Sequence, residues 1–514
     1  MEPSNEQQTN ETASSSRSPK SEGEDALTGA YAAADGGEDI EPGADRVREE
    51  LGAAQTSILG FWRENPIPLE MVGVGLGLLA CNAAAFPQGE FHACDFNPEH
   101  VRGGRDYASS LGVTNIQFHE ASFAQLLSTA LPTFDFIVLH GVYSWVGAEE
   151  RAAVREIIRT KLAAAGLVYV SYNCMPGWAS ELPVRRMLVE LAAAAPGDSA
   201  AKMRHAVEAL ERMKDRKLRF FEANPEAARA IESYGKVPAN YLAHEFLNQT
   251  WQPFYSVDVV DEMASANVTL VGSATLADNH PMLVIEEAAA EALKLLTTPR
   301  QVHLAMDFAT NRRFRRDIFV RSDTPRTPED ATRALETAII GCVSDPEQLT
   351  NKVTVPRGQI TFQPDFMDAL KSLLRGGSTT LAEAAMTLAN AAMAAGGERR
   401  NHAEILRNIA FLVAGGALAP FAKVRRCSTP VEVTRPANAI VERSLGGIIR
   451  QQAARAIPSE LLGNGVLVRP AEALAIVELL SGTPAALVTT VPREVVQHVA
   501  TVLLPSLARL QLVS

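Results

Sequence analysis

The sequence predicts an α/β protein in which a doubly wound parallel sheet is followed by a helical insertion and a mostly helical C-terminal domain. Three observations predict this. Short apolar runs alternate with helix-length segments up to about residue 181, a glycine-rich turn follows the first run, and helical periodicity dominates from residue 182 onward. Parallel neighbours need a long crossover connection, so this alternation is typical of a parallel sheet.

Length and composition exclude several classes of protein. A chain of 514 residues is too long for one small module, and its 46% hydrophobic content excludes a largely disordered protein. The net charge is -12, but no basic stripe is present, which excludes nucleic acid as the main partner. The five cysteines are scattered singly, so we expect no metal site and no disulfide framework.

Residues 1–45 are rich in Glu, Ser, Thr, Gly and Ala and contain almost nothing bulky. Such a segment cannot offset its ordering entropy by burial, so we predict a disordered acidic tail. The N-terminus lacks the basic and apolar regions of a signal peptide, and no apolar run approaches the roughly 18 residues of a membrane span. We therefore expect a cytoplasmic protein without membrane insertion.

The predicted domains follow the pattern of the chain. Residues 46–181 form the sheet domain, with strands at 67–73, 90–95, 115–119, 135–140 and 166–172. Residues 182–298 form a helical lid followed by a mixed segment, in which 268–271 and 282–285 read as strands. Residues 299–514 form a mostly helical domain, with a β-prone stretch at 358–362 that could make a small wing.

The first strand runs into a glycine loop, Gly73-Val74-Gly75-Leu76-Gly77. Glycines at a strand-to-helix turn let backbone N–H groups approach an anionic ligand at the helix N-terminus. The dinucleotide fingerprint requires glycine one position later, where Leu78 stands, and this disfavours NAD and FAD.

Asp95 follows at the end of the second strand. A carboxylate there can accept hydrogen bonds from both ribose hydroxyls of an adenosine, and Phe96 can pack on the adenine. With the glycine loop, this acid indicates S-adenosylmethionine as the cofactor. The alternative is that the glycines only make a tight turn and that Asp95 only caps the next helix.

Polar and aromatic side chains cluster where the fourth and fifth strands end. They are His140, Tyr143, Trp145 and Tyr172. Ligands of open α/β sheets bind outside the carboxyl ends of the strands, so we expect these four residues to be catalytic and to face the methyl donor.

The run FDFIVLHGVYSWV at residues 134–146, with 168–173 and 176–178, closely resembles class I methyltransferases that carry a methyltransferase regulatory domain. This bacterial family includes the rickettsial lysine methyltransferases that act on outer-membrane protein. Residues 241–247 and 253–255 resemble the signature of the regulatory domain, and residues 307–315 resemble a segment that follows it. The resemblance implies a Rossmann-like domain that binds S-adenosylmethionine.

The resemblance also implies roles for individual residues. It places Gly73, Gly75 and Gly77 around the methionine part of the cofactor, Asp95 on the ribose, Ser122 and Phe123 at the adenine, and His140 and Tyr143 beside the transferred methyl group. The chain departs from the family pattern at Met71 and Ser122, where acids are usual. It also lacks the Tyr- and Pro-rich element that usually precedes the first strand, at residues 56–62.

These features predict a methyltransferase, and the resemblance favours lysine in a protein substrate, for instance an outer-membrane protein, as the acceptor. Aromatic rings such as Tyr143, Trp145, Tyr172 and Tyr255 could desolvate a lysine ammonium, and His140 or Glu245 could accept its proton. Two alternatives stay open: a non-catalytic scaffold with a degenerate cofactor loop, and a methyltransferase for a small molecule. A homodimer also stays open.

Overall fold

The computed structural model describes residues 70–74, 76–248, 250–321, 334–394, 401–425, 435–451 and 454–513. The predicted acidic tail, residues 56–62 and Gly75 lie outside this part of the chain. Within it, no helix has both the length and the apolar character needed to cross a membrane.

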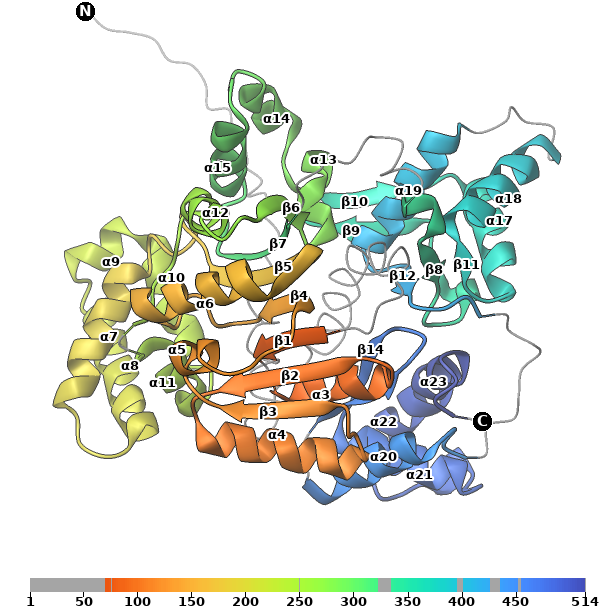
Figure 1. Ribbon diagram of the computed structural model, residues 1–514, viewed down its shortest axis with the longest axis horizontal. Coiled ribbons are helices and arrows are strands. Elements are labelled where there is room, and N and C mark those ends of the chain that lie inside the picture. The colour runs from red at the N-terminus through yellow and green to blue at the C-terminus, as the bar shows by residue number, and fades with distance from the viewer. Residues whose placement is uncertain are drawn as a thin grey trace, which may run out of the picture.

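A seven-stranded sheet forms the centre of the protein, in the order β3-β2-β1-β4-β5-β7-β6 (Figure 1). Strands β1 to β5 pair in parallel, whereas β7 is antiparallel to both β5 and β6. The strands are β1 (Glu70–Val74), β2 (Glu90–Asp95), β3 (Ile116–Glu120), β4 (Phe134–Leu139), β5 (Leu162–Asn173), β6 (Thr269–Ser273) and β7 (Phe314–Val320). The predicted α/β fold with a parallel sheet is confirmed.

Helices cover both faces of this sheet. They are α3 (Leu76–Ala85), α4 (Pro98–Leu111), α5 (Phe123–Leu127) and α6 (Ala148–Lys161). Strand side chains alternate between the two faces. Phe91 and Phe136 therefore pack with Leu79 of α3 on one face, while Ile137 and Val170 belong to the core on the α6 face.

The strand β7 corrects the expected domain boundary after residue 298. Its pairing with β5 extends from Leu167 opposite Val320 to Asn173 opposite Phe314, so the segment beyond residue 298 completes the sheet. The elements between β5 and β7 that pack beside the sheet are α12 (Ser256–Ala264), η1 (Leu276–Asn279), α13 (Pro281–Val284), α14 (Glu287–Leu293) and α15 (Pro299–Ala309).

The prediction of a strand at residues 282–285 is wrong. Pro281 opens a short helix there, as proline favours at the first helical position.

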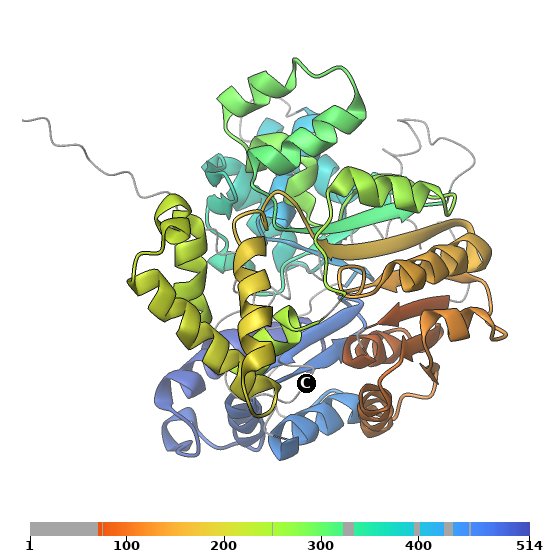
Figure 2. The same ribbon diagram turned by 90° about the vertical axis from the view of Figure 1, so that its left-hand side faces the viewer.

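A separate helical unit gathers at one end of the sheet, as Figures 1 and 2 show. Its helices are α7 (Leu182–Ala194), α8 (Ser199–Asp215), α9 (Arg219–Ala223), α10 (Pro225–Tyr234) and α11 (Ala239–Phe246). They share one apolar core, in which the edge of Trp178 meets the ring of Trp251 at a centroid distance of 4.8 Å. Residues 182–246 therefore fold as a packed helical unit.

The C-terminal region contains two further cores rather than one. The first is built from β8 (Ile339–Gly341), η2 (Pro346–Gln348), β9 (Lys352–Val355), β10 (Gly358–Thr361), α17 (Pro364–Arg375), β11 (Thr379–Thr380), α18 (Leu381–Ala394), α19 (His402–Ala414) and β12 (Ala419–Phe421). The second is built from α20 (Ala439–Gln451), β13 (Arg455–Ser459), β14 (Asn464–Val468), α21 (Pro470–Leu480), η3 (Ala485–Leu487), α22 (Arg493–His498), η4 (Val499–Leu503) and α23 (Leu504–Arg509). The β-prone stretch at 358–362 forms β10, which pairs antiparallel with β9.

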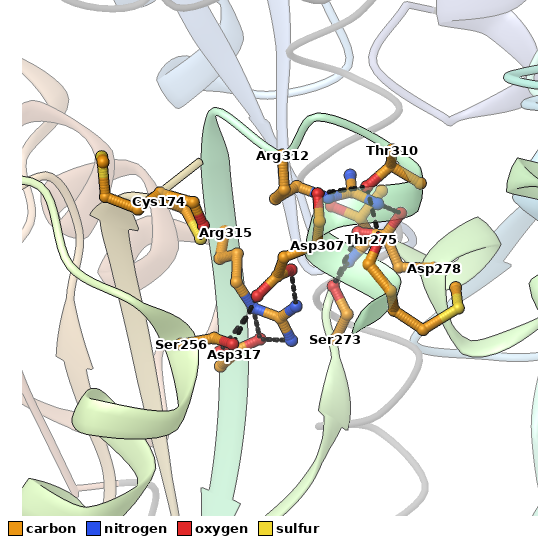
Figure 3. Close-up of polar contacts among 12 residues, drawn as sticks. Cys174, Ser256, Ser273, Thr275, Asp278, Asp307, Thr310, Arg312, Arg315 and Asp317 are labelled. Atoms are coloured by element: carbon orange, nitrogen blue, oxygen red, sulfur yellow. Dashed lines mark hydrogen bonds and ion pairs between the residues drawn. The ribbon is translucent and has the colours of Figure 1, made fainter. Parts of the chain in front are cut away.

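A buried ionic cluster joins β7 to α15 and to further elements beside it (Figure 3). The Arg315 guanidinium donates to Asp307 at 2.6 Å and to Asp317 at 2.9 Å, and both carboxylates are almost fully buried. Ser256 of α12 donates to Asp307, and the Tyr172 hydroxyl of β5 donates to Asp317 at 2.6 Å. Four elements thus meet around one guanidinium.

Replacing Arg315 is expected to destabilise the protein severely. An Arg315→Met variant leaves two buried carboxylates without their cation, which costs about 3–5 kcal/mol. Urea denaturation should report this loss. Arg375→Met, which removes an exposed pair with Glu347, is the matched control and should leave the urea midpoint almost unchanged. Equal losses in the two variants would contradict the structural role of the cluster.

Candidate functional site

The candidate site lies at the carboxyl edge of the parallel strands. In Figure 1 the arrowheads of β1, β2 and β3 point toward the helical unit of α7 to α11. Strand β1 lies between β2 and β4, so the order of the strands reverses at β1. Ligands of open α/β sheets bind in the crevice at such a reversal.

The glycine loop borders this crevice. Strand β1 ends at Val74 and α3 begins at Leu76, which confirms the predicted strand-to-helix turn. Gly73 lies in the strand and Gly77 in the first turn of the helix, whereas Gly75 is outside the described residues. The N-terminus of α3 therefore lies at the carboxyl edge, where free N–H groups and the helix dipole favour an anionic group.

Asp95 ends β2, and its side chain is 15% exposed. One carboxylate oxygen accepts from the Asn97 amide at 2.8 Å, and the other lies 3.0 Å from His100 Nδ1. The N-cap of α4 is Asn97, whose side chain accepts from the Glu99 amide, so Asp95 does not cap that helix. Each Asp95 oxygen keeps a lone pair for a ligand. The neighbouring Phe96 is 78% exposed and free to pack on one.

Ser122 has a structural partner that the sequence analysis missed. Its hydroxyl accepts from the Gln125 amide at 3.2 Å while its own amide donates to the Gln125 side chain at 2.9 Å, a capping box at the start of α5. The Phe123 amide donates to Glu150, in the first turn of α6, at 3.0 Å. Ser122 and Phe123, the two residues expected at the adenine, thus already make hydrogen bonds within the protein.

A Ser122→Ala variant separates the two roles of this hydroxyl. Losing the cap should reduce the free energy of unfolding by about 1 kcal/mol, measured by thermal or urea denaturation. Because the hydroxyl serves the helix, the affinity for S-adenosylmethionine should stay within about twofold. A loss of affinity without a loss of stability would instead assign Ser122 to the cofactor.

His140 follows β4 and has an unusually low basicity. Its Nδ1 lies 3.3 Å from the Tyr169 hydroxyl, and the two rings stack at a centroid distance of 5.9 Å. Burial lowers the pKa of His140 to about 4, and the charge of Arg316 acts in the same direction. The imidazole is therefore neutral near pH 7 and poorly suited to accept a proton from an amine.

Tyr143 and Tyr172 were expected to line a substrate pocket, and the structure contradicts this. Both rings are fully buried in the core on the α6 face of the sheet. The Tyr143 hydroxyl donates to Glu262, which also pairs with Arg155 at 2.7 Å, and the Tyr172 hydroxyl donates to Asp317. Tyr143 therefore binds α12 and Tyr172 links β5 to β7, and neither presents a surface to a substrate.

Trp145 lies elsewhere, with the core of the helical unit. Its carbonyl accepts from the Thr250 hydroxyl at 2.6 Å and from the Asn248 side chain at 3.3 Å. Tyr255, which precedes α12, is 38% exposed. The four rings expected to share one pocket are therefore divided between two cores and the surface.

The exits of β4 and β5 are joined by hydrogen bonds. The Gly141 amide donates to the Ser171 hydroxyl at 2.7 Å, and the Asn173 amide donates to the Ser144 hydroxyl at 2.8 Å. Asn173 is the last residue of β5 and is buried. The two strand ends form one continuous rim beside the crevice.

Glu245 of α11 meets this rim. Its Oε1 accepts from Trp251 Nε1 at 3.1 Å and lies 3.5 Å from Asn173 Nδ2. Burial raises the pKa of Glu245 to about 6, although these two hydrogen bonds and the charges of Arg313 and Arg185 act in the opposite direction. Glu245 is thus a carboxylate that is still ionised at pH 7 and that holds a proton far more readily than an exposed one.

Two aromatic side chains lie near this carboxylate: Trp251, which donates to it, and Tyr241. The Arg185 guanidinium lies 4.6 Å from the centre of the Trp251 ring. Tyr241, one turn before Glu245 on α11, has a pKa raised by its burial and by the charge of Glu245. An acid among aromatic rings can receive a cation, because the carboxylate pairs with it and the rings attract it. Glu245 was predicted from the sequence, whereas Trp251 and Arg185 were not.

Comparisons with known proteins fit this geometry. Two family models match, a methyltransferase domain at residues 71–164 and a predicted methyltransferase regulatory domain at residues 238–321. The uncharacterized protein sll1526 of Synechocystis sp. is 33% identical over 301 residues, which are 59% of this chain and 60% of that relative. The uncharacterized protein RP789 of Rickettsia prowazekii is 26% identical over 267 residues, 51% of this chain and 47% of that relative. The chain thus matches less than two thirds of each relative.

Among solved structures, PKMT2 from Rickettsia typhi superposes with a TM-score of 0.64 at 18% identity, over 90% of this chain and 98% of that chain. The same protein in complex with AdoHcy superposes with a TM-score of 0.61. At 18% sequence identity, this structural similarity establishes the fold alone. Together with the two family models, it confirms the resemblance predicted from residues 134–146 and 241–255.

The residues at the carboxyl edge fit S-adenosylmethionine, which is the cofactor of this fold and domain. The glycine turn leads into the positive end of α3, and Asp95 stands at the end of the neighbouring strand. The exposed Phe96 ring beside it offers a face for a purine.

Proposed function

We propose that this chain, a class I S-adenosylmethionine-dependent methyltransferase with an adjoining methyltransferase regulatory domain, transfers the methyl group to the side-chain amine of lysine in a protein. The observation that carries this proposal is the Glu245 carboxylate, set among aromatic rings and tied to the end of β5 through Asn173. The likeness to PKMT2 and the resemblance to rickettsial lysine methyltransferases support a protein as the acceptor.

A lysine acceptor has to lose a proton before it can react. Its unperturbed pKa of about 10.4 leaves the amine protonated and without a free electron pair at pH 7. Entry into a partly dry, aromatic site disfavours both the ammonium and the carboxylate charge. The gap between the pKa values of lysine and Glu245 therefore narrows, and the proton can pass to the carboxylate.

The residues of the chain then have separate tasks. When bound, S-adenosylmethionine would supply a methyl group on a sulfonium, and the deprotonated amine would attack the methyl carbon in line with the departing thioether. Asp95 and the glycine loop hold the cofactor at the strand ends, and Glu245 holds the ammonium and accepts its proton. Arg185 and Arg313 keep Glu245 ionised near pH 7, because their charges oppose the rise in its pKa caused by burial.

A labelling experiment tests the proposal. The purified chain is incubated with S-adenosylmethionine that carries an isotopically labelled methyl group, together with either an array of lysine-containing peptides or a pool of small metabolites. The expected result is label on lysine side chains, located by mass spectrometry. Label confined to metabolites would favour a small-molecule acceptor, and cofactor binding without any transfer would favour the scaffold alternative.

A further inference from the structure

The helix α3, which follows the glycine loop, has an unusual composition. Its sequence, LGLLACNAAA, contains no charged residue and only one polar residue, Asn82. A surface helix normally has a polar face, whereas a helix that is apolar all round is buried on more than one side. Leu79 and Ala83 pack toward the sheet with Phe91, while Ala80 packs on another side with Leu111 of α4. Another part of the chain has to cover the remaining surface.

That cover is the hairpin of β13 and β14 from the second C-terminal core, which contacts α3 along both of its strands. The Tyr107 hydroxyl of α4 donates to the Ala456 carbonyl of β13 at 3.1 Å, and the Arg455 guanidinium lies 4.5 Å from the centre of the Tyr107 ring. Cys81 of α3 is only 1% exposed beneath this hairpin. Figure 1 shows the same C-terminal unit lying against α3 and α4.

The approach of the hairpin is close enough to require a glycine. A Cβ atom on Gly465 of β14 would lie 2.7 Å from the Cys81 sulfur and 2.6 Å from Ala456 Cβ. Both distances are shorter than real Cβ contacts, so any larger residue would push the hairpin away from α3. A second tether lies nearby, where the Arg443 guanidinium of α20 donates to the Leu111 carbonyl at the end of α4 at 2.7 Å.

We infer that the β13–β14 hairpin is a positioning element of the cofactor site, which fixes α3 and with it the glycine loop. Cys81 lies four residues after Gly77, a rise of about 6 Å along the helix, so a shift at the hairpin reaches the loop within one turn. This inference rests on the proposed function, in which the cofactor binds at the glycine loop that precedes α3. Docking of the hairpin and binding of the cofactor then favour each other reciprocally.

The first test changes the packing at Gly465. A Gly465→Val variant of the full chain should bind the demethylated cofactor product, S-adenosylhomocysteine, about tenfold more weakly in calorimetric titration. Tyr107→Phe, which removes one hydrogen bond, should have a smaller effect in the same direction. Gly447→Ala is the matched control, because a Cβ at this position in α20 meets nothing within 4 Å. The affinity of this control should equal that of the wild type.

The second test uses the wild-type chain, so it does not depend on whether a variant folds. Cys81 should be alkylated several-fold more slowly when S-adenosylhomocysteine is present, as measured by mass spectrometry of peptides. Cys342, buried in the other C-terminal core, is the internal control and should react at an unchanged rate.

The outcomes separate the inference from the proposed function. A folded Gly465→Val protein with wild-type affinity, or a Cys81 alkylation rate that the ligand does not change, would overturn the inference while leaving the proposed function intact. A folded wild-type chain that does not bind the ligand would overturn the cofactor placement and the inference together.

Discussion

A Glu245→Gln variant is expected to lose methyl transfer to lysine by a factor on the order of 10² to 10⁴, the usual contribution of a positioned acid or base. Glutamine keeps the shape of the side chain and can still accept from Trp251, but it cannot take a proton. Cofactor affinity should not change, because no cofactor contact is assigned to Glu245. Glu208→Gln, an exposed acid of α8, is the matched control and should retain full activity.

The same variant should be more stable than the wild type at neutral pH. Burial raises the pKa of Glu245 to about 6 in the folded protein, above the value of about 4.3 in an unfolded chain. Ionisation of Glu245 therefore lowers the free energy of unfolding of the wild type. This loss develops as the pH rises from about 4.3 through 6. The melting temperatures of variant and wild type should coincide near pH 4 and diverge by pH 7.5.

Transfer by the wild type should also fall below about pH 6, as Glu245 becomes protonated and no longer pairs with the ammonium. A Glu245→Gln protein that is less stable than the wild type at pH 7.5 and still methylates lysine would contradict both parts of this account.

An Asp95→Ala variant is expected to lose affinity for S-adenosylmethionine by a factor on the order of 10². Hydrogen bonds to a charged acceptor contribute about 1.5–3 kcal/mol each, and the variant loses the carboxylate assigned to both ribose hydroxyls. The rise in melting temperature that saturating cofactor produces in the wild type should disappear in the variant. Glu99→Ala removes an exposed acid four residues along the chain and should preserve that rise. If saturating cofactor raised the melting temperature of Asp95→Ala and of the wild type equally, Asp95 would not be a cofactor-binding residue.

The parallel part of the fold could be predicted from the sequence because its signals are local. Each buried strand is a short apolar run, and the expected positions of β2 and β4 differ from the observed ones by at most a residue at each end. The strand β7 gave no comparable signal, since FRRDIFV carries three consecutive charged residues, which is not the pattern of a buried strand. Some of its charges are accommodated by partners far away in sequence, such as Tyr172 for Asp317. Only the folded chain reveals this pairing.

The candidate site was predicted only in part for a related reason. Gly73, Gly77 and Asp95 lie at or just after the carboxyl ends of strands, where the rule that ligands bind at strand ends predicts a cofactor. The same rule failed for Tyr143 and Tyr172, because it does not say which face of the sheet a ring occupies or what covers that face.

The acid-aromatic cluster was harder to predict, because it is assembled from separate parts of the chain. Asn173 comes from β5, Glu245 from α11 and Trp251 from the loop that follows α11. One available signal was not used: the uniformly apolar sequence of α3 indicated that a further segment had to cover that helix.

The most direct test of the central claim is a calorimetric titration of the purified full chain with S-adenosylmethionine. We expect saturable binding at one site per chain, with competition by S-adenosylhomocysteine. A chain that is folded by circular dichroism, yet gives neither binding heat nor a cofactor-dependent change in melting temperature, would contradict it.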